Sequence, residues 1–208
     1  MGGHHRGRHA VAVAFALAPE GIVNVTNGSG SSTGGRHRAR PEVLDIEEFN
    51  ALDGDAAAEV LRACLDIEEW VTTVAAGRPY PQVDELYAAG AAAGADITWP
   101  QVAGALDRHP RIGERAAAAP GSATEKAWSS AEQAGVAETS ARALAQGNAD
   151  YERRFGHILL ICASGLSGEQ ILADLQARLA LDPVAERAVV MTELRKIAAL
   201  RLAKAVTS

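Results

Sequence analysis

The sequence predicts an all-α fold, a compact single domain of about eight or nine helices preceded by a disordered N-terminal extension. From Asp45 onward, apolar residues recur at the three- and four-residue spacing of amphipathic helices, and no sustained alternation of β-branched and aromatic residues predicts strands. Helix-capping residues precede most of these apolar patterns. We therefore expect the extension over residues 1–40 and the helical domain over residues 41–208.

Caps and breakers predict the first three helices. Asp45 can cap a short helix that ends at Leu52, and Asp55 is expected to open the second helix. The inward stripe of this second helix consists of Val60, Leu61, Cys64 and Leu65. The third helix is expected over residues 68–76, because Gly77 follows it.

The next two helices lead to a histidine. The apolar stripe of the first contains Val83, Leu86 and Tyr87. Thr98 and Gln101 have the spacing of a capping box for the second. This helix must end near Arg108, because the residue before a proline is disfavoured in the α region and His109 precedes Pro110.

Four further helices are predicted after a loop. We expect them over residues 122–134, 138–154 and 167–179, and from residue 182 nearly to the end. The residues that cap or open three of them are Ser122 with Glu125, Ser167 with Gln170, and Asp182 with Pro183. Between the second and third lies HILLICA, a short and fully apolar run over residues 157–163.

Composition excludes several classes of function. The net charge of −6 and the interspersed Lys and Arg residues give no basic patch, so we expect no nucleic-acid partner. No apolar run approaches the roughly 20 residues that span a bilayer. The cysteines, Cys64 and Cys162, both lie in apolar stretches and predict buried thiols in a reducing compartment. We therefore expect a cytoplasmic protein.

The first 40 residues allow two interpretations. MGGHHRGRH followed by AVAVAFALA has the basic-then-apolar order of a secretory signal, with Ala16–Ala18 as a candidate cleavage box. Pro19 and the Gly/Ser-rich stretch at residues 27–35 instead favour a flexible upstream extension or a misplaced start. We expect the extension.

Three features carry candidate chemistry. His109 follows a helix end, where the helix dipole favours the imidazolium by about 0.3–1 kcal/mol, so it can act as a general acid or simply cap the helix. Ser129, Glu132 and Gln133 share one helical face. They are either functional groups of a site or ordinary solvent-exposed residues. Arg201 stands on the apolar stripe of the last helix, where it either pairs with a carboxylate or an anionic ligand, or snorkels to solvent.

No metal or nucleotide site is predicted, because His157 has no partner at ligand spacing and the glycines form no phosphate-binding loop. A cofactor-independent site of imidazole, carboxylate, amide and guanidinium remains. Two functional readings fit these residues. One is a non-catalytic helical interaction module, and the other is a hydrolase in which His109 and Glu132 activate water.

Taken together, the motifs closely resemble those of the 2-oxo-4-hydroxy-4-carboxy-5-ureidoimidazoline (OHCU) decarboxylases. The resemblance covers residues 44–205. The residues that carry it are His109–Gly113 (HPRIG), Trp128–Gly135 (WSSAEQAG), Tyr151, Arg154–Gly156, Glu193, Lys196–Ile197 and Leu200–Leu202. His157–Ile158 departs from the family, which usually has an aromatic-proline pair there.

The resemblance implies a carboxy-lyase of urate (purine) catabolism that converts OHCU, a small-molecule ureidoimidazoline carboxylate, to (S)-allantoin without a cofactor or metal. It also implies a homodimer. His109 would be the catalytic proton donor. The substrate pocket would be lined by Pro110, Ser129, Glu132, Gln133, Leu159, Leu160, Ile161, Cys162, Ala163 and Arg201.

Overall fold

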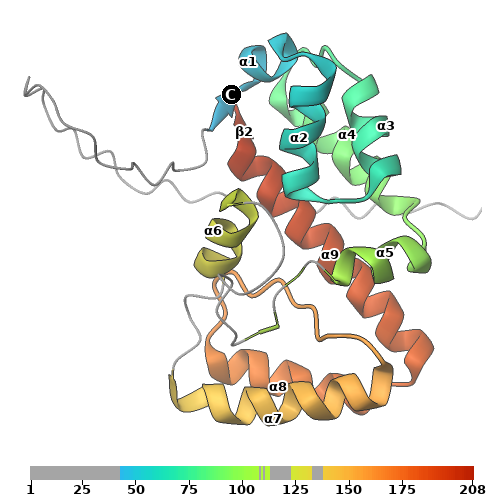
Figure 1. Cartoon of the computed structure of the whole chain (residues 1–208), viewed down its shortest axis with the longest axis vertical. Helices are drawn as coiled ribbons and strands as arrows, with labels where there is room; N and C mark the ends of the chain where they lie inside the picture. Colours follow the sequence, from blue (N-terminus) through green and yellow to red (C-terminus); the bar gives the residue numbers. More distant parts are fainter. Residues whose placement is uncertain (1–42, 108, 110, 113–122, 133–137) are drawn as a thin grey trace, which may run out of the picture. The chain divides into compact units, whose positions relative to one another are not determined.

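The long C-terminal helix α9 (Pro183–Ala205) is the element around which the other helices pack in this computed structural model (Figure 1). The structure describes residues 43–107, 109, 111–112, 123–132 and 138–208. The extension predicted over residues 1–40 lies outside this part of the chain and stays a prediction. The other described helices are α1 (Ile46–Ala51), α2 (Gly54–Cys64), α3 (Glu68–Ala76), α4 (Val83–Ala95), α5 (Trp99–Leu106), α6 (Ala123–Glu132), α7 (Glu138–Phe155) and α8 (Gly168–Arg178).

The helices confirm the predicted all-α class and most of the predicted caps. Asp45 caps α1 in a reciprocal capping box with Glu48, and Ser167 does the same for α8 with Gln170. At α5, Gln101 Oε1 accepts from the Thr98 N–H at 2.8 Å. The predicted Ser122 cap of α6 lies outside the described residues.

Two predicted helix boundaries are wrong by about half a turn. Asp53, not Asp55, caps α2, because its carboxylate accepts from the Ala56 N–H at 2.8 Å and Gly54 becomes the first helical residue. Helix α5 ends at Leu106 rather than near Arg108. The tight turn that follows it includes a bond from the His109 N–H to the Leu106 carbonyl at 3.0 Å.

A two-residue parallel strand pair, which the sequence did not predict, joins the two ends of the described chain. Strand β1 (Leu44–Asp45) pairs with β2 (Val206–Thr207), with Leu44 opposite Val206. The Tyr87 hydroxyl donates to the Val206 carbonyl at 2.6 Å and so ties β2 to α4. Two residues are too few to show the alternation by which strands are recognised in a sequence.

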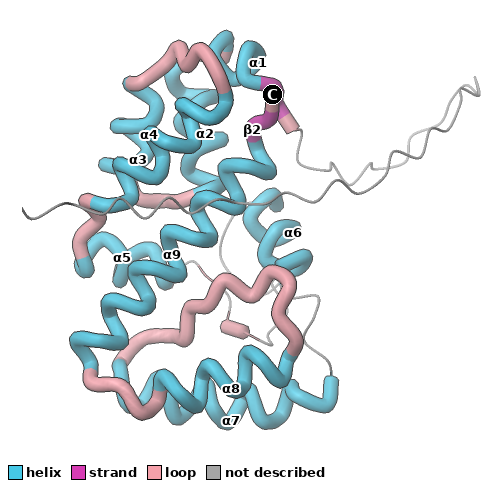
Figure 2. The backbone as a smooth tube through the Cα atoms, turned by 180° about the vertical axis from the view of Figure 1, so that it is seen from behind, coloured by secondary structure: helices cyan, strands magenta, loops and turns pink. Residues whose placement is uncertain are grey.

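Two apolar clusters form the core. The first gathers side chains of α2, α3, α4, α5 and α9, and the second gathers Ile112 with side chains of α7 and α8. Both views of the backbone place α7 and α8 side by side near the start of α9, while α2 to α4 lie along its later turns (Figure 2).

The apolar run HILLICA connects the two clusters. Ile158, Leu160 and Cys162 pack against the first cluster, whereas Leu159, Ile161 and Ala163 belong to the second. Such alternation is the pattern of an extended chain, whose successive side chains point to opposite faces. Both faces are buried, which explains why every residue of the run after His157 is apolar or a cysteine.

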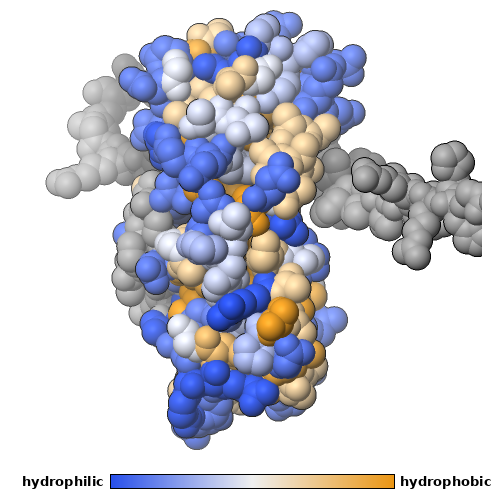
Figure 3. All heavy atoms as spheres, turned by 90° about the vertical axis from the view of Figure 1, so that its right-hand side faces the viewer, coloured by the Kyte–Doolittle hydropathy of each residue, from blue (hydrophilic) through white to orange (hydrophobic). Residues whose placement is uncertain are grey.

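The surface is largely polar. On the face drawn in Figure 3, hydrophilic side chains are interspersed with smaller apolar areas, and the exposed large hydrophobic residues among those described are Val43 and Val184. In the described part of the chain, no helix has both the length and the apolar character needed to cross a membrane.

Candidate active site

His109 lies in the turn after α5, and its half-buried ring is held by the helix that precedes it. Its Nδ1 atom lies 3.0 Å from the Ala105 carbonyl, and its Nε2 atom is shielded from solvent. A carbonyl oxygen can only accept, so Nδ1 carries a proton and Nε2 is the atom that can gain or lose one. The geometry therefore fixes the tautomer of the ring.

Helix α7 anchors the residues that follow His109. The Arg111 guanidinium donates to both carboxylate oxygens of Glu152, with Nη2 at 2.9 Å from Oε2. The bonds from Arg111 hold the pKa of Glu152 below its usual value. One turn earlier on α7, the Asn148 amide donates to the Ile112 carbonyl at 2.8 Å. The turn that carries His109 is thus held between α5 and α7.

Arg201 is buried, which excludes the alternative that it snorkels to solvent. It is 3% exposed on the core-facing side of α9, and its Nη2 donates to the Ser129 hydroxyl of α6 at 3.0 Å. Ser129 is itself only 5% exposed, and the neighbouring Trp128 packs into the first cluster. The hydroxyl of Ser129 is thus a partner of the guanidinium, whereas the sequence led us to expect a carboxylate or an anionic ligand.

The pKa of the Cys64 thiol is affected by the charge of Arg201. Burial raises the pKa of Cys64 to about 12, while the charge of Arg201 acts to lower it and that of Glu125 to raise it. Helices α2, α6 and α9 therefore converge around this guanidinium. The Cys64 thiol stays neutral near pH 7, consistent with the predicted inert buried thiol, and neither Cys64 nor Cys162 forms a disulfide.

Polar side chains bind the backbone of the HILLICA segment. The Leu160 carbonyl accepts from Arg178 Nη1 at 2.7 Å, and the Cys162 N–H donates to Glu193 Oε2 at 2.9 Å. Leu159, Leu160, Ile161 and Ala163 are buried, whereas Cys162, which was predicted to be buried, is only half-buried. The segment predicted to line the pocket is thus fixed from α8 and α9.

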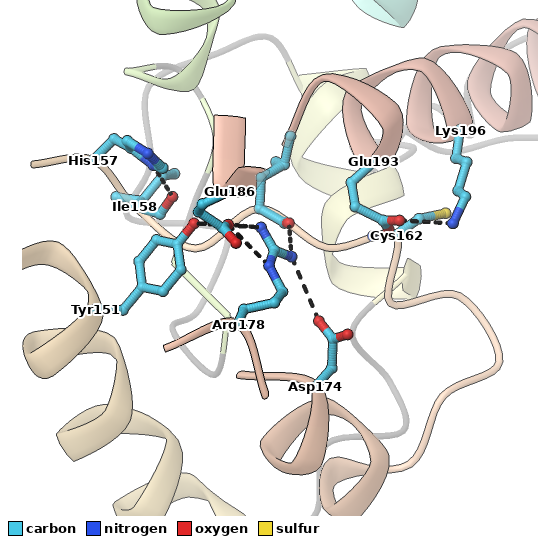
Figure 4. A network of polar contacts seen from close by, with 10 residues as sticks. Tyr151, His157, Ile158, Cys162, Asp174, Arg178, Glu186, Glu193 and Lys196 are labelled. Carbon is cyan, nitrogen blue, oxygen red and sulfur yellow. Dashed lines mark hydrogen bonds and ion pairs between the residues drawn. The ribbon is translucent and has the colours of Figure 1, made fainter. Parts of the chain in front are cut away.

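A buried polar network lies beside this segment (Figure 4). Glu186 on α9 is fully buried and accepts from the Tyr151 hydroxyl and from Arg178, whose Nε lies 2.9 Å from Oε1. Burial raises the pKa of Tyr151, and the bond to Glu186 raises it further. Burial acts to lower the pKa of Arg178, but the bond to Glu186 and the nearby charges of Glu186, Tyr151 and Asp174 together outweigh it, so this pKa is also raised.

His157, which departs from the family pattern, occupies an aromatic environment. Its ring packs edge-on against Trp99, with centroids 5.1 Å apart, and against Tyr151 at 5.5 Å, and it stacks on Phe155 at 6.1 Å. The imidazole therefore fills the place of an aromatic side chain at the start of the segment.

The structure unites some of the predicted site residues and does not address others. Ser129 meets Arg201, whereas His109 lies in the turn after α5, a helix that also packs on α9. Pro110, Gln133 and the side chain of Glu132 lie outside what the structure describes.

Polar residues that the sequence interpretation gave no role support the site. Asn148 and Glu152 hold the turn after His109, and Arg178 and Glu193 hold the apolar segment. Glu193 belongs to a family motif, which was the available signal. Within the described residues, no three His, Cys, Asp or Glu side chains gather as a metal site would require.

Comparison with known proteins identifies the family of this chain. A family model described as OHCU decarboxylase matches residues 50–203. The chain belongs to the OHCU decarboxylase family. The family is one of decarboxylases that act on a small molecule, so this chain is a lyase and not a non-catalytic helical module.

Two relatives of this OHCU decarboxylase family member act in urate degradation or carry the family name. The 2-oxo-4-hydroxy-4-carboxy-5-ureidoimidazoline decarboxylase of Haloferax volcanii is 28% identical over 166 residues, which cover 79% of this chain and 98% of that protein. The uric acid degradation bifunctional protein TTL of Arabidopsis thaliana is 30% identical over 151 residues. That match covers 69% of this chain but 45% of the Arabidopsis protein.

Solved structures share the fold of this OHCU decarboxylase family member. An OHCU decarboxylase crystallised in the presence of (S)-allantoin superposes with a TM-score of 0.57 and 25% identity, over 69% of this chain and 94% of that one. An (S)-allantoin synthase superposes with a TM-score of 0.59 over 79% of this chain and 54% of that one. At 15% identity, the second comparison establishes the fold alone.

Proposed function

We propose that this chain removes the carboxylate of OHCU to give (S)-allantoin, using its own side chains and no organic cofactor. Membership of the OHCU decarboxylase family and the structural relative crystallised in the presence of (S)-allantoin support the reaction. The observation that carries the assignment to this site is the buried Arg201 guanidinium, which meets Ser129 within the family-matched region.

Arg201 and Ser129 recognise the charge of the substrate. A guanidinium offers five N–H donors in a plane and binds carboxylates through paired hydrogen bonds. Its burial strengthens the attraction to an anion, because little water screens the charge. The Ser129 hydroxyl, bonded to Nη2 at 3.0 Å, keeps the guanidinium plane in one orientation. We assign the remaining contacts with the ring and ureido groups to Glu132 and Gln133.

His109 delivers the proton. Loss of carbon dioxide breaks one C–C bond and leaves its electron pair on the ring carbon, where the adjacent nitrogen-carbon system delocalises it. No metal or organic electron sink is needed for that step. The Ala105 carbonyl holds the proton on Nδ1, so the proton that is transferred to the ring carbon leaves from Nε2 of the imidazolium. A fixed ring protonates one face and gives one enantiomer.

We also assign the apolar walls of the substrate pocket. Pro110 and the segment Leu159–Ala163 form the walls that orient the substrate. The fixed backbone of that segment, bonded to Arg178 and Glu193, supports this role.

The test uses freshly generated 5-hydroxyisourate and its hydrolase, to which the purified chain is added. We expect faster decay of OHCU, release of carbon dioxide and a circular dichroism signal of (S)-allantoin. Unchanged decay or racemic allantoin would refute the assignment. Acceleration without carbon dioxide release would instead support the hydrolase reading, in which His109 and Glu132 activate water.

Two further properties are proposed: a homodimer, which the resemblance implies, and a cytoplasmic location, which the apolar setting of the two cysteines favours. Light scattering should give twice the 21.6 kDa mass of one chain. A mass of 21.6 kDa at working concentrations would contradict the dimer. Fractionation of the native cells tests the location.

A further inference from the structure

Side chains hold one edge of the extended segment Leu159–Ala163. Arg178 donates to the Leu160 carbonyl at 2.7 Å, and Glu193 accepts from the Cys162 N–H at 2.9 Å. In an extended chain, the backbone groups of residues two apart point to the same edge. Arg178 and Glu193 therefore occupy one edge together, at the places where a neighbouring strand would bond.

Helix α9 supplies the carboxylates for both anchors. Glu186 acts through Arg178, and Glu193 acts directly. The two glutamates are seven residues apart, so they lie within about 20° of each other around the helix. Arg201 follows eight residues after Glu193, about 12 Å further along the same axis. Because α9 is one continuous helix, it fixes the segment relative to the Arg201 guanidinium.

The Glu193 carboxylate is itself held in place. Its Oε1 accepts from the Lys196 ammonium at 2.6 Å, while Oε2 faces the Cys162 N–H (Figure 4). The Glu193 side chain is 12% exposed and Lys196 is 59% exposed, so the cation covers the carboxylate on its solvent side. The bond to Glu193 also raises the pKa of Lys196.

We propose that Glu193 is a positioning residue for the decarboxylation, because it sets the register of the Leu159–Ala163 backbone against the bound substrate. The inference rests on the proposed function. With one edge held by α8 and α9, the N–H and C=O of Ile161 point to the opposite edge. That peptide can then meet the amide groups of a ureido or ring substituent. Glu193 acts through the segment and does not touch the substrate.

The test compares two substitutions at this position with one control on the same helix. E193A removes the acceptor, whereas E193Q keeps an amide oxygen that can bond the Cys162 N–H. T192A alters the adjacent exposed residue, whose hydroxyl donates to the Ala188 carbonyl of its own helix. kcat and KM for OHCU are measured at a temperature at which all three variants are fully folded. Amide hydrogen exchange at Cys162 is followed in parallel.

We expect E193A to lower kcat/KM about 100-fold, since a displacement of about 1 Å in a substrate-orienting group has an effect of that size. A raised KM and faster exchange at Cys162 should accompany it. If part of the E193A sample were merely unfolded, the apparent kcat would fall but KM would stay unchanged. E193Q and T192A should stay within about threefold of the wild type in kcat/KM.

Three outcomes would overturn the proposal. E193A within about threefold of the wild type refutes the positioning role while leaving the decarboxylase function intact. E193Q as impaired as E193A shows that charge, not the position of the acceptor, matters. A wild-type chain that does not decarboxylate OHCU refutes the proposed function and the positioning role with it.

Discussion

Replacing Tyr151 with phenylalanine tests the energetics of the buried network most cleanly. The hydroxyl of Tyr151 donates to the Glu186 carboxylate and lies 3.3 Å from Arg178 Nη2, while its ring is fully buried. Phenylalanine keeps the packing and removes only the hydroxyl. A hydrogen bond to a charged group contributes about 1.5–3 kcal/mol to stability, whereas a bond to a neutral group contributes about 0.5–1.5 kcal/mol.

We therefore expect Y151F to lower the free energy of unfolding by about 1.5–3 kcal/mol. At about 2–4 °C per kcal/mol for a domain of this size, the melting temperature should fall by about 3–12 °C. Y80F is the matched control, because the buried Tyr80 hydroxyl donates to the neutral Val74 carbonyl at 2.6 Å. Urea unfolding monitored by circular dichroism measures both variants.

The pH dependence gives an independent check. Burial and the Glu186 bond raise the pKa of Tyr151, so the hydroxyl ionises at lower pH in the unfolded chain than in the folded one. Its contribution is complete below about pH 10 and is lost as the pH rises above that value. The difference in stability between wild type and Y151F should shrink there. A Y151F loss no larger than that of Y80F, with no change above pH 10, would refute the reasoning.

Three other predictions follow from local geometry. The Cys64 thiol, with its pKa raised to about 12 by burial, should resist iodoacetamide at pH 8 in the native state and react once urea unfolds the chain. G147A should lower the free energy of unfolding by about 1–3 kcal/mol, because a Cβ there would lie 2.8 Å from the Leu175 side chain. G104A should raise this free energy by about 0.4–1 kcal/mol, because the added Cβ would have no other atom within 4 Å. E68Q breaks the exposed ion pair with Arg62 and should change the free energy of unfolding by less than about 1 kcal/mol. Chemical denaturation measures the free energy of unfolding of G147A, G104A and E68Q.

Helix positions could be predicted from the sequence because caps act locally. Residues 68–76 were predicted as a helix and are helical, and Asp182 caps α9 as expected. The start of α2 was misplaced because Asp53 and Asp55 are both good caps and Gly54 is tolerated in a first turn. Which aspartate caps depends on packing that the sequence pattern does not contain.

The candidate site could be predicted only where a residue broke a pattern. Arg201 was noticeable because a cation stood on an apolar stripe, and it is buried against Ser129. Arg178 and Glu186 broke no pattern, because a basic residue in a last turn and an acidic one in a first turn are ordinary at helix ends. Their pairing requires α8 and α9 to meet in space. The hydrogen bond from the Cys162 backbone to Glu193 leaves no trace in residue types at all.

The most direct test of the central claim is the rate of (S)-allantoin formation by H109N. Asparagine can still donate an N–H to the Ala105 carbonyl, as Nδ1 of His109 does, but it lacks the Nε2 proton. We predict an unchanged far-ultraviolet circular dichroism spectrum and melting curve, together with loss of the acceleration and of the enantiomeric excess. An H109N variant that keeps most of the wild-type rate and still gives (S)-allantoin would show that another group donates the proton, and it would contradict the account.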